Sequence, residues 1–429
     1  MVRKTVKRKT DGHTRESKKP NLDVLILAAG EGTRMRPLTA NIPKPLLPVA
    51  GKPFLEHTIL ALRDSGLKDI RILIGWKDHK IQEYFGDGTK FGVNISYLEQ
   101  EKRLGTAHAV GMAKGKIRND FLCINGDVVM NSMQIKQVTS FFMEKGENIM
   151  MTTKVDNPSI YGIVESDSSS RVRRIIEKPK NFIGNLANAG VYVFKPEIFD
   201  TIDKTQQSPR GEYEITDSLQ ILADMNRVYA YVAENCIDVT HPWDILTANE
   251  YLMKTVKTRI DGTLDKNVTI KGEVIIGKGT IVRSGTYIIG PVIVGEHSEI
   301  GPNCLIRPST CIGNNCKVGN ACEVKNTIIM DDTHVPHLNY VGDSVIGERC
   351  NLGAGTKVAN LRFDDRPISA THGGRTLSTG RRKLGVIMGD DVQTGINSSI
   401  DAGTIIGENT LIGPGAFVRG TIAPNSRIF

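Results

Sequence analysis

The sequence predicts an α/β protein in two parts, a doubly wound parallel sheet followed by a parallel β-helix. Apolar runs typical of strands alternate with amphipathic segments typical of helices as far as about residue 256. From about residue 264 an aliphatic residue instead recurs every six positions. The length of 429 residues is enough for two or three domains.

The first part opens on LDVLILA, residues 22–28, whose apolar run, VLILA, is typical of a strand buried on both faces. The glycine-rich segment GEGTR follows as a tight turn. Later apolar runs come closer together and predict a mixed extension of the sheet. We expect helices at 53–65, 78–84, 106–114, 133–145 and 243–256, and further strands at 70–75, 94–98, 121–124, 148–154, 161–165, 172–176 and 189–195.

The second part carries a six-residue repeat. Ten consecutive positions in steps of six, from Ile270 to Val324, are all Ile or Val. This pattern predicts coils in which each unit forms one flat side and points its aliphatic residue inward. The register resumes at Ile346 and again at Met388, so we expect excursions from the stack at 325–345 and 359–387. Excursions in such arrays gather on one face, which is often where binding occurs.

Four cysteines share a place in this repeat. Each follows an aliphatic position by four residues, where other repeats carry Thr, Ser or Ala; they are Cys304, Cys316, Cys322 and Cys350. The chain has no C-x-x-C pair. We therefore expect small, reduced side chains that fill turns, with a zinc site as the minor alternative.

Composition indicates a globular protein, with 39% hydrophobic and 24% charged residues. No stretch of about 18 apolar residues is present, and the start has no apolar run of a secretory signal, so we expect a cytoplasmic protein without a membrane partner. The net charge is +8, of which residues 1–20 contribute +6. We expect a basic, disordered leader at 1–20 and no nucleic-acid partner.

Two segments near the start favour phosphate binding. Residues 25–37, LILAAGEGTRMRP, place glycines directly after a strand, where backbone N–H groups can approach phosphates. Arg34 in this segment and Lys44 in the next, PKPLLPVAGKP, are cations suited to a polyphosphate.

With these segments, residues 22–256 resemble the sugar-1-phosphate nucleotidylyltransferases. Further motifs of that family follow in order: Gln100 with LGTA, NGD ending at Asp127, YG at 161–162, EKP at 177–179, NAG at 188–190, and CIDVTHPWD. In this family a sugar phosphate oxygen attacks the α-phosphorus of a nucleoside triphosphate, and pyrophosphate leaves.

The resemblance implies roles for individual residues. Arg34 and Lys44 are expected to be catalytic, and Asp127 and Asp238 to hold Mg²⁺. The nucleotide-binding residues it implies are Ala28, Ala29, Gly30, Gly32, Thr33, Gln100, Gly105 and Thr106. The sugar-phosphate-binding residues are Gly162, Glu177, Lys178 and Asn188.

The segment HVPHLNYVGD, residues 334–343, resembles the acetyltransferase loop of a bifunctional family. Its members join a glucosamine-1-phosphate acetyltransferase to an N-acetylglucosamine-1-phosphate uridylyltransferase, and the LRFDD and GRRKLG segments are similar to the archaeal form. The resemblance implies a left-handed β-helix and makes His337 the general base, with His334 as the competing candidate. The substrate-binding residues it implies are Arg307, Lys325, Tyr340, Asn351 and Asn360. The remaining histidines, His372 among them, are read as ordinary.

We therefore expect a nucleotidylyltransferase domain at 21–258 and an acetyltransferase domain at 264–429. The bifunctional enzyme would acetylate glucosamine-1-phosphate with acetyl-CoA and couple the product to UTP, or to dTTP, as a homotrimer formed through the β-helix. One alternative is a single-activity glucose-1-phosphate uridylyl- or thymidylyltransferase with a structural β-helix. Another is a non-catalytic scaffold similar to translation-initiation factor subunits. The His337–Tyr340 loop counts against the first, and the phosphate-gripping cations count against the second.

Overall fold

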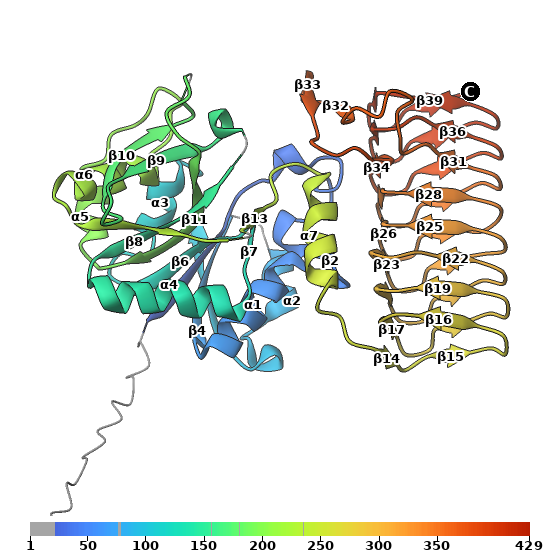
Figure 1. Ribbon diagram of the computed structural model, residues 1–429, viewed down its shortest axis with the longest axis horizontal. Coiled ribbons are helices and arrows are strands. Elements are labelled where there is room, and N and C mark those ends of the chain that lie inside the picture. The colour runs from blue at the N-terminus through green and yellow to red at the C-terminus, as the bar shows by residue number, and fades with distance from the viewer. Residues whose placement is uncertain (1–21, 76–78, 156, 180, 235) are drawn as a thin grey trace, which may run out of the picture.

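The computed structural model describes residues 22–75, 79–155, 157–179, 181–234 and 236–429. A sheet domain and a three-sided β-helix lie side by side, with helix α7 between them (Figure 1). The leader predicted at 1–20 lies outside the described residues. No helix in the described ranges is long and apolar enough to cross a membrane.

The sheet of the first domain is parallel at its centre and mixed at one side. Strand β1 lies between β4 and β6, and all three run parallel, while β11 pairs antiparallel with β6. The predicted mixed extension is therefore confirmed. Its strands are β1 (Asp23–Ala28), β4 (Asp69–Gly75), β5 (Asn94–Gln100), β6 (Phe121–Asn125), β8 (Asn148–Lys154), β9 (Gly162–Ser166), β10 (Val172–Glu177), β11 (Leu186–Phe194) and β12 (Val228–Val232).

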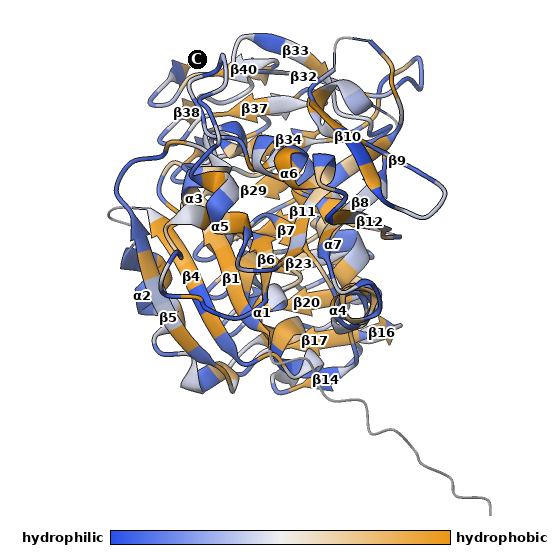
Figure 2. Cartoon of the chain, turned by 90° about the vertical axis from the view of Figure 1, so that its left-hand side faces the viewer, coloured by the Kyte–Doolittle hydropathy of each residue, from blue (hydrophilic) through white to orange (hydrophobic). Residues whose placement is uncertain are grey.

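Helices cover both faces of this sheet, as a doubly wound fold requires. They are α1 (Phe54–Ser65), α2 (His79–Phe85), α3 (Thr106–Gly111), α4 (Ser132–Lys145), α5 (Ile198–Ile202), α6 (Ile215–Asp224) and α7 (Asp244–Met253). Apolar residues of α1 and α4 pack on one face, and those of α3 and α6 pack on the other. The five predicted helices are present, and the central strands carry the apolar residues coloured orange in Figure 2.

Several short elements complete the first domain. They are the 3-10 turns η1 (Thr33–Met35), η2 (Lys44–Leu46), η3 (Thr89–Phe91) and η4 (Pro158–Ile160), and the strands β2 (Pro48–Val49), β3 (Lys52–Pro53), β7 (Val128–Val129) and β13 (Ile237–Asp238). The antiparallel pairing of β13 with β7 brings chain segments more than 100 residues apart to one edge of the domain.

The second domain is a left-handed β-helix with three parallel sheets. The sheet facing the first domain contains β14 (Arg259–Ile260), β17 (Val274–Ile276), β20 (Val292–Val294), β23 (Thr310–Ile312), β26 (Ile328–Ile329), β29 (Val345–Ile346), β34 (Val386–Met388), β37 (Thr404–Ile406) and β40 (Thr421–Ile422). The second sheet contains β15 (Thr263–Leu264), β18 (Ile281–Val282), β21 (Glu299–Ile300), β24 (Lys317–Val318), β27 (His334–Val335), β30 (Asn351–Leu352), β35 (Gln393–Thr394), β38 (Leu411–Ile412) and β41 (Arg427–Ile428). The third contains β16 (Thr269–Lys271), β19 (Tyr287–Ile289), β22 (Leu305–Ile306), β25 (Glu323–Lys325), β28 (Tyr340–Gly342), β31 (Lys357–Val358), β36 (Ser399–Ile400) and β39 (Phe417–Val418).

The repeat positions form the core of the β-helix, where residues such as Val282 and Ile300 are fully buried. The excursion predicted at 325–345 is wrong. Strands β26, β27 and β28 continue the coil there, with Ile329, Val335 and Val341 inside. The spacing between inward-pointing residues is five instead of six at two places, one just before Ile329 and one just after Val341. The inward-pointing residues still stack.

The excursion predicted at 359–387 is confirmed. It leaves the stack after β31 and returns at β34, and it carries the hairpin of β32 (Ser369–His372) and β33 (Arg375–Ser378). The hairpin turns at Gly373 and Gly374, which both have positive φ, as a two-residue hairpin turn favours.

The four cysteines of the repeat are buried free thiols, as predicted. Burial raises the pKa of the Cys316 thiol to about 12, so this thiol stays protonated. Its Sγ lies 3.1 Å from the carbonyl oxygen of Met330 on the next coil, and its N–H donates to the Ser298 hydroxyl of the coil before. These small side chains therefore link successive coils at a turn.

Helix α7 fixes the first domain against the β-helix. The side chain of Asn249 is fully buried, accepts a hydrogen bond from the Ala50 N–H at 2.9 Å and donates to the Ser309 carbonyl at 2.8 Å. Apolar residues around it, among them Leu246 and Ile293, form one core shared by both domains.

Candidate functional site

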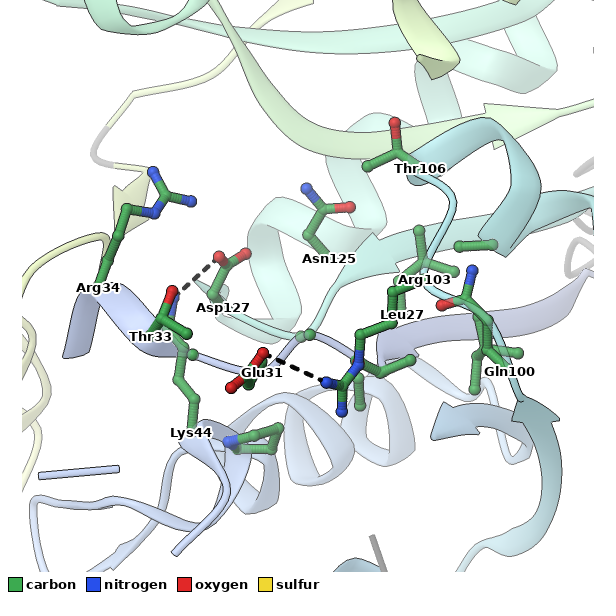
Figure 3. A pocket seen from close by; sticks show the side chains of 18 of the residues that line it. Leu27, Glu31, Thr33, Arg34, Lys44, Gln100, Arg103, Thr106, Asn125 and Asp127 are labelled. Carbon is green, nitrogen blue, oxygen red and sulfur yellow. Dashed lines mark hydrogen bonds and ion pairs between the residues drawn. The ribbon is translucent and has the colours of Figure 1, made fainter. Parts of the chain in front are cut away.

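A cavity of about 470 Å³ opens where several strands of the first domain end. Strands β1 and β6 lead directly into its wall, and β5 ends there at Gln100 (Figure 3). In open α/β sheets, ligands bind outside the carboxyl ends of the strands, where neighbouring connections diverge. All eight predicted nucleotide-binding residues line this cavity, and so do Arg34, Lys44 and Asp127.

Two glycines in the wall are required by the backbone. Gly32 has φ 69°, and a Cβ there would lie 3.2 Å from the Cβ of Lys44. Gly105 has φ 109°, and a Cβ there would lie 2.5 Å from the backbone oxygen of Tyr213. Any larger residue would be strained at both positions. The glycines therefore keep the chain close enough for its N–H groups to face a bound phosphate.

Charged groups face one another at the floor of the cavity. The ammonium of Lys44 lies 2.9 Å from a carboxylate oxygen of Asp127 (Figure 3). Asp238 on β13 sits opposite, because β13 pairs with β7 directly after Asp127. Burial, and then the charge of Asp127, raise the pKa of Asp238 to about 6. The structure thus brings together two carboxylates that the sequence separates by 111 positions.

This carboxylate pair fits a magnesium ion. Mg²⁺ is held in enzymes by one or two carboxylates together with substrate phosphates, and it removes the repulsion between two facing anions. Within the described ranges no group of three or more His, Cys, Asp or Glu side chains forms an all-protein metal site. Asp127 and Asp238 would therefore share the ion with the substrate.

Three of the predicted sugar-phosphate residues, Gly162, Glu177 and Asn188, lie close together, and Lys178 follows Glu177 along the chain. Asn188 and Asp238 line an adjoining cavity of about 220 Å³. Gly162 lies opposite Glu177 in the β9–β10 pair, and a Cβ on Gly162 would stand 2.8 Å from a carboxylate oxygen of Glu177. The Lys178 ammonium lies 3.8 Å from the same carboxylate group.

Two arginines of the first domain were missed in the sequence. Arg103 lines the 470 Å³ cavity, donates to the carbonyl of Ala29 at 2.8 Å and pairs with Glu31 (Figure 3). It stands directly before the LGTA segment, and that adjacency is the signal that could have found it. Arg210 lies 3.3 Å from Glu177, but nothing in its local sequence marks it.

Three of the predicted acetyltransferase residues, Lys325, Tyr340 and Asn360, lie on the β-helix around a buried carboxylate. Asp343 is 3% exposed and accepts hydrogen bonds from the Lys325 ammonium at 2.9 Å and from the Asn360 amide at 2.6 Å. The same amide lies 3.2 Å from the hydroxyl of Tyr340. Asp343 closes the HVPHLNYVGD segment, and that position in the motif is the signal that could have found it.

The remaining acetyltransferase candidates flank this cluster. Arg307 lies one coil before Lys325, with its N–H donating to the carbonyl of Val324. His337 is exposed in the turn between β27 and β28, and its carbonyl accepts from the N–H of Gly355. Asn351 is exposed on β30 of the second sheet. His337 and Asp343 therefore lie just before and just after β28 along the chain.

Comparison with known proteins identifies the family. The Nucleotidyl transferase family model matches residues 23–255, and the GMPPB C-terminal domain model matches residues 288–428. The chain is 42% identical to the bifunctional protein GlmU of Methanocaldococcus jannaschii, over 95% of this chain and 97% of that protein. It is 40% identical to the bifunctional sugar-1-phosphate nucleotidylyltransferase/acetyltransferase of Sulfurisphaera tokodaii, over 93% and 97%. The chain belongs to this bifunctional family.

Membership of this family confirms the predicted resemblance and the prediction of a bifunctional transferase. A structure titled a putative glucose-1-phosphate thymidylyltransferase, from Bacillus anthracis, matches with a TM-score of 0.51 at 26% identity. That match covers 97% of the bacterial chain and only 56% of this one. The bifunctional relatives, in contrast, match 93–95% of this chain and so include both domains.

Proposed function

We propose that this chain makes UDP-N-acetylglucosamine in two steps, acetylation in residues 264–429 followed by uridylyl transfer in residues 21–258. The observation that carries the proposal is the presence of two separate polar sites on one chain. One is the cavity of Arg34, Lys44 and the facing carboxylates, and the other is the cluster around Asp343.

Uridylyl transfer needs alignment and charge neutralisation more than covalent chemistry. An oxygen of the sugar phosphate bonds to the α-phosphorus of UTP while the bond to pyrophosphate breaks. Arg34 and Lys44 bind the triphosphate and stabilise the negative charge that develops on it. Asp127 and Asp238 would hold Mg²⁺, which supplies further neutralisation of the phosphate oxygens when bound.

The sugar half of the reaction is assigned to the adjoining cavity. The carboxylate of Glu177 and the amide of Asn188 would hydrogen-bond sugar hydroxyls, and the Lys178 ammonium would pair with the sugar phosphate. Glu177 is half-buried, and burial raises its pKa. A carboxylate in that environment gains from a hydroxyl donor, since such hydrogen bonds replace lost water.

In acetyl transfer the amine of glucosamine-1-phosphate attacks the thioester carbonyl of acetyl-CoA. The new C–N bond forms, the C–S bond breaks, and the coenzyme leaves as its thiol. His337 accepts the proton from the attacking amine and returns it to the sulfur as the C–S bond breaks, since an imidazole can both take up and release a proton. Arg307 and Lys325 would meet the sugar phosphate, Tyr340 and Asn351 orient the amino sugar, and Asn360 lies beside the thioester.

We propose a homotrimer assembled through the β-helix, with each acetyl site formed between neighbouring copies. Large apolar side chains are exposed on the third sheet and at its corner with the second, at Phe417, Leu338 and Ile396. Such exposed apolar groups favour burial against another surface. The nucleotide and coenzyme A substrates, together with the reduced cysteines, support a cytoplasmic location.

A matched pair of variants tests the two-site assignment in the full-length protein. We expect Asp127→Asn to lower uridylyl transfer by about 10³-fold, comparable to other losses of electrostatic stabilisation, and to leave acetyl transfer unchanged. We expect His337→Ala to lower acetyl transfer by about 10²–10⁴-fold and to leave uridylyl transfer unchanged. Pyrophosphate release and free-thiol release measure the two reactions separately. Loss of both activities in either folded variant would contradict the assignment.

The substrates are tested in the same assays. Glucosamine-1-phosphate and galactosamine-1-phosphate are supplied in parallel with acetyl-CoA, and UTP and dTTP in parallel with the acetylated product. The proposal expects the highest kcat/KM for glucosamine-1-phosphate and UTP. A higher kcat/KM for dTTP or for galactosamine-1-phosphate would change the proposed product but not the assignment of the two sites.

A further inference from the structure

The excursion at 359–387 reaches from the β-helix to the nucleotide site of the other domain. It begins beside Asn360 in the acetyl site and presents the β32–β33 hairpin toward the first domain (Figure 1). After the hairpin, Arg381 donates to the Thr247 hydroxyl at 2.9 Å and pairs with Glu250, both on α7. The hairpin is thus anchored at its base against the first domain.

The ring of His372, at the turn of this hairpin, contacts the backbone of Arg34. Its Nε2 lies 3.0 Å from the Arg34 carbonyl oxygen. A carbonyl can only accept, so Nε2 carries the proton and donates it. Burial and the neighbouring His241 lower the pKa of His372, which favours the neutral ring.

The local sequence explains why this carbonyl needs a donor from elsewhere. In a continuing 3-10 turn, the carbonyl of Arg34 would accept from the N–H of residue 37. Residue 37 is proline and has no N–H. The next N–H, that of Leu38, donates to Met35 instead. The turn that carries Arg34 is therefore completed by a side chain of the other domain.

The same ring touches the segment that carries the second carboxylate. His372 meets Trp243 edge to face, with ring centroids 6.3 Å apart, and Trp243 stacks on His241 at 4.8 Å. The N–H of His241 donates to Asp244, and the Thr240 hydroxyl donates to Asp238. One imidazole thus lies between the turn of Arg34 and the segment of Asp238.

We propose that His372 is a positioning residue for uridylyl transfer that the acetyltransferase domain supplies. It holds the Arg34 turn and the Asp238 segment in fixed relation, so the nucleotide site is complete only with the hairpin in place. The inference rests on the proposed function, because it assumes that Arg34 acts on the triphosphate. His372 itself touches no reacting atom.

Three substitutions in the full-length protein test this role. His372→Phe keeps a ring against Trp243 but removes the donor, and we expect the kcat of uridylyl transfer to fall about tenfold with KM for UTP within twofold. His372→Gln keeps an N–H donor, and we expect it to recover most of that kcat. Arg375→Ala, an exposed change in the same hairpin, is the control and should leave both reactions unchanged.

The outcomes separate the inference from the proposed function. Acetyl transfer and the thermal midpoint should stay at wild-type values in all three variants. A wild-type kcat for His372→Phe, an equal loss in His372→Gln, or a parallel loss of acetyl transfer would each overturn the positioning role. If the wild-type protein itself performed no uridylyl transfer, the proposed function would fail instead.

Discussion

The carboxylate of Asp343 offers the most direct test of how the β-helix builds its polar site. Its two oxygens receive hydrogen bonds from Lys325 at 2.9 Å, Asn326 at 2.9 Å and Asn360 at 2.6 Å. In Asp343→Asn one oxygen becomes an amide nitrogen, which is itself a donor. At least one of the three donors then faces another donor in a buried place.

The magnitude follows from burial. The Lys325 side chain is 18% exposed and that of Asp343 is 4% exposed, so their pair is mostly buried. Removing one partner of a buried pair costs about 3–5 kcal/mol, and the slight exposure of Lys325 places the loss near the lower end, at about 3 kcal/mol. For a domain of this size, that loss lowers the thermal midpoint by about 6–12 °C. We also expect kcat/KM for acetyl transfer to fall about 100-fold, because Lys325 and Asn360 would both lose their anchor; that factor corresponds to about 3 kcal/mol of activation free energy.

Calorimetry and free-thiol release in the full-length protein measure the two effects. Glu299→Gln is the matched control. It breaks the ion pair of Glu299 with Arg283 on the same β-helix, and both of these side chains are about 40% exposed. Exposed pairs contribute at most about 1 kcal/mol, so the control should shift the midpoint by less than about 4 °C. The reasoning would be refuted if Asp343→Asn matched the control in both its thermal midpoint and its kcat/KM for acetyl transfer. Uridylyl transfer should be unchanged in both variants.

Three further predictions address the metal, the sugar phosphate and the repeat. Chelation of divalent cations with EDTA should abolish pyrophosphate release and leave acetyl transfer intact; persistence of both reactions would remove Asp127 and Asp238 from the metal role. Lys178→Ala should raise KM for the sugar phosphate about tenfold, since one charge-assisted bond is worth about 1.5 kcal/mol, and a change confined to KM for UTP would exclude this role. Ile300→Ala should cost about 2–5 kcal/mol of unfolding free energy, because the side chain is fully buried. Ile260→Ala, at a position that is 41% exposed, should cost much less. Equal losses of unfolding free energy in denaturant would contradict the inward stacking of the repeat residues.

The elements of the sheet domain could be predicted because their signals are local. The run VLILA, residues 24–28, is apolar throughout, and β1 is buried between two parallel strands. Helices α5 and α6 were missed. The first spans only five residues, too few for a clear period, whereas the second spans ten and has an apolar face that was overlooked. The coil at 325–345 was misread as an excursion because a fixed count of six cannot allow for a five-residue step.

The site residues also fall into those that local sequence could predict and those that only tertiary contacts reveal. Gly32, Arg34 and Lys44 were found because they lie close together in a short segment, in an order typical of a family. The pairing of Asp127 with Asp238 needed the contact of β7 with β13. Asp343 was passed over although it closes the HVPHLNYVGD segment. His372 was read as ordinary, because nothing in its immediate neighbours along the chain reveals which groups it meets.

The amino-acid sequence by itself determined the two architectures, their order along the chain and the residues that grip phosphate, since periodicity and short motifs act over a few neighbouring residues. Only the tertiary structure decided which distant groups meet. It set the two carboxylates face to face, buried Asp343 among three donors, and brought the hairpin of one domain onto the backbone of Arg34 in the other. Contacts of this kind depend on how whole domains pack, and packing is a property of surfaces that are assembled only when the chain has folded.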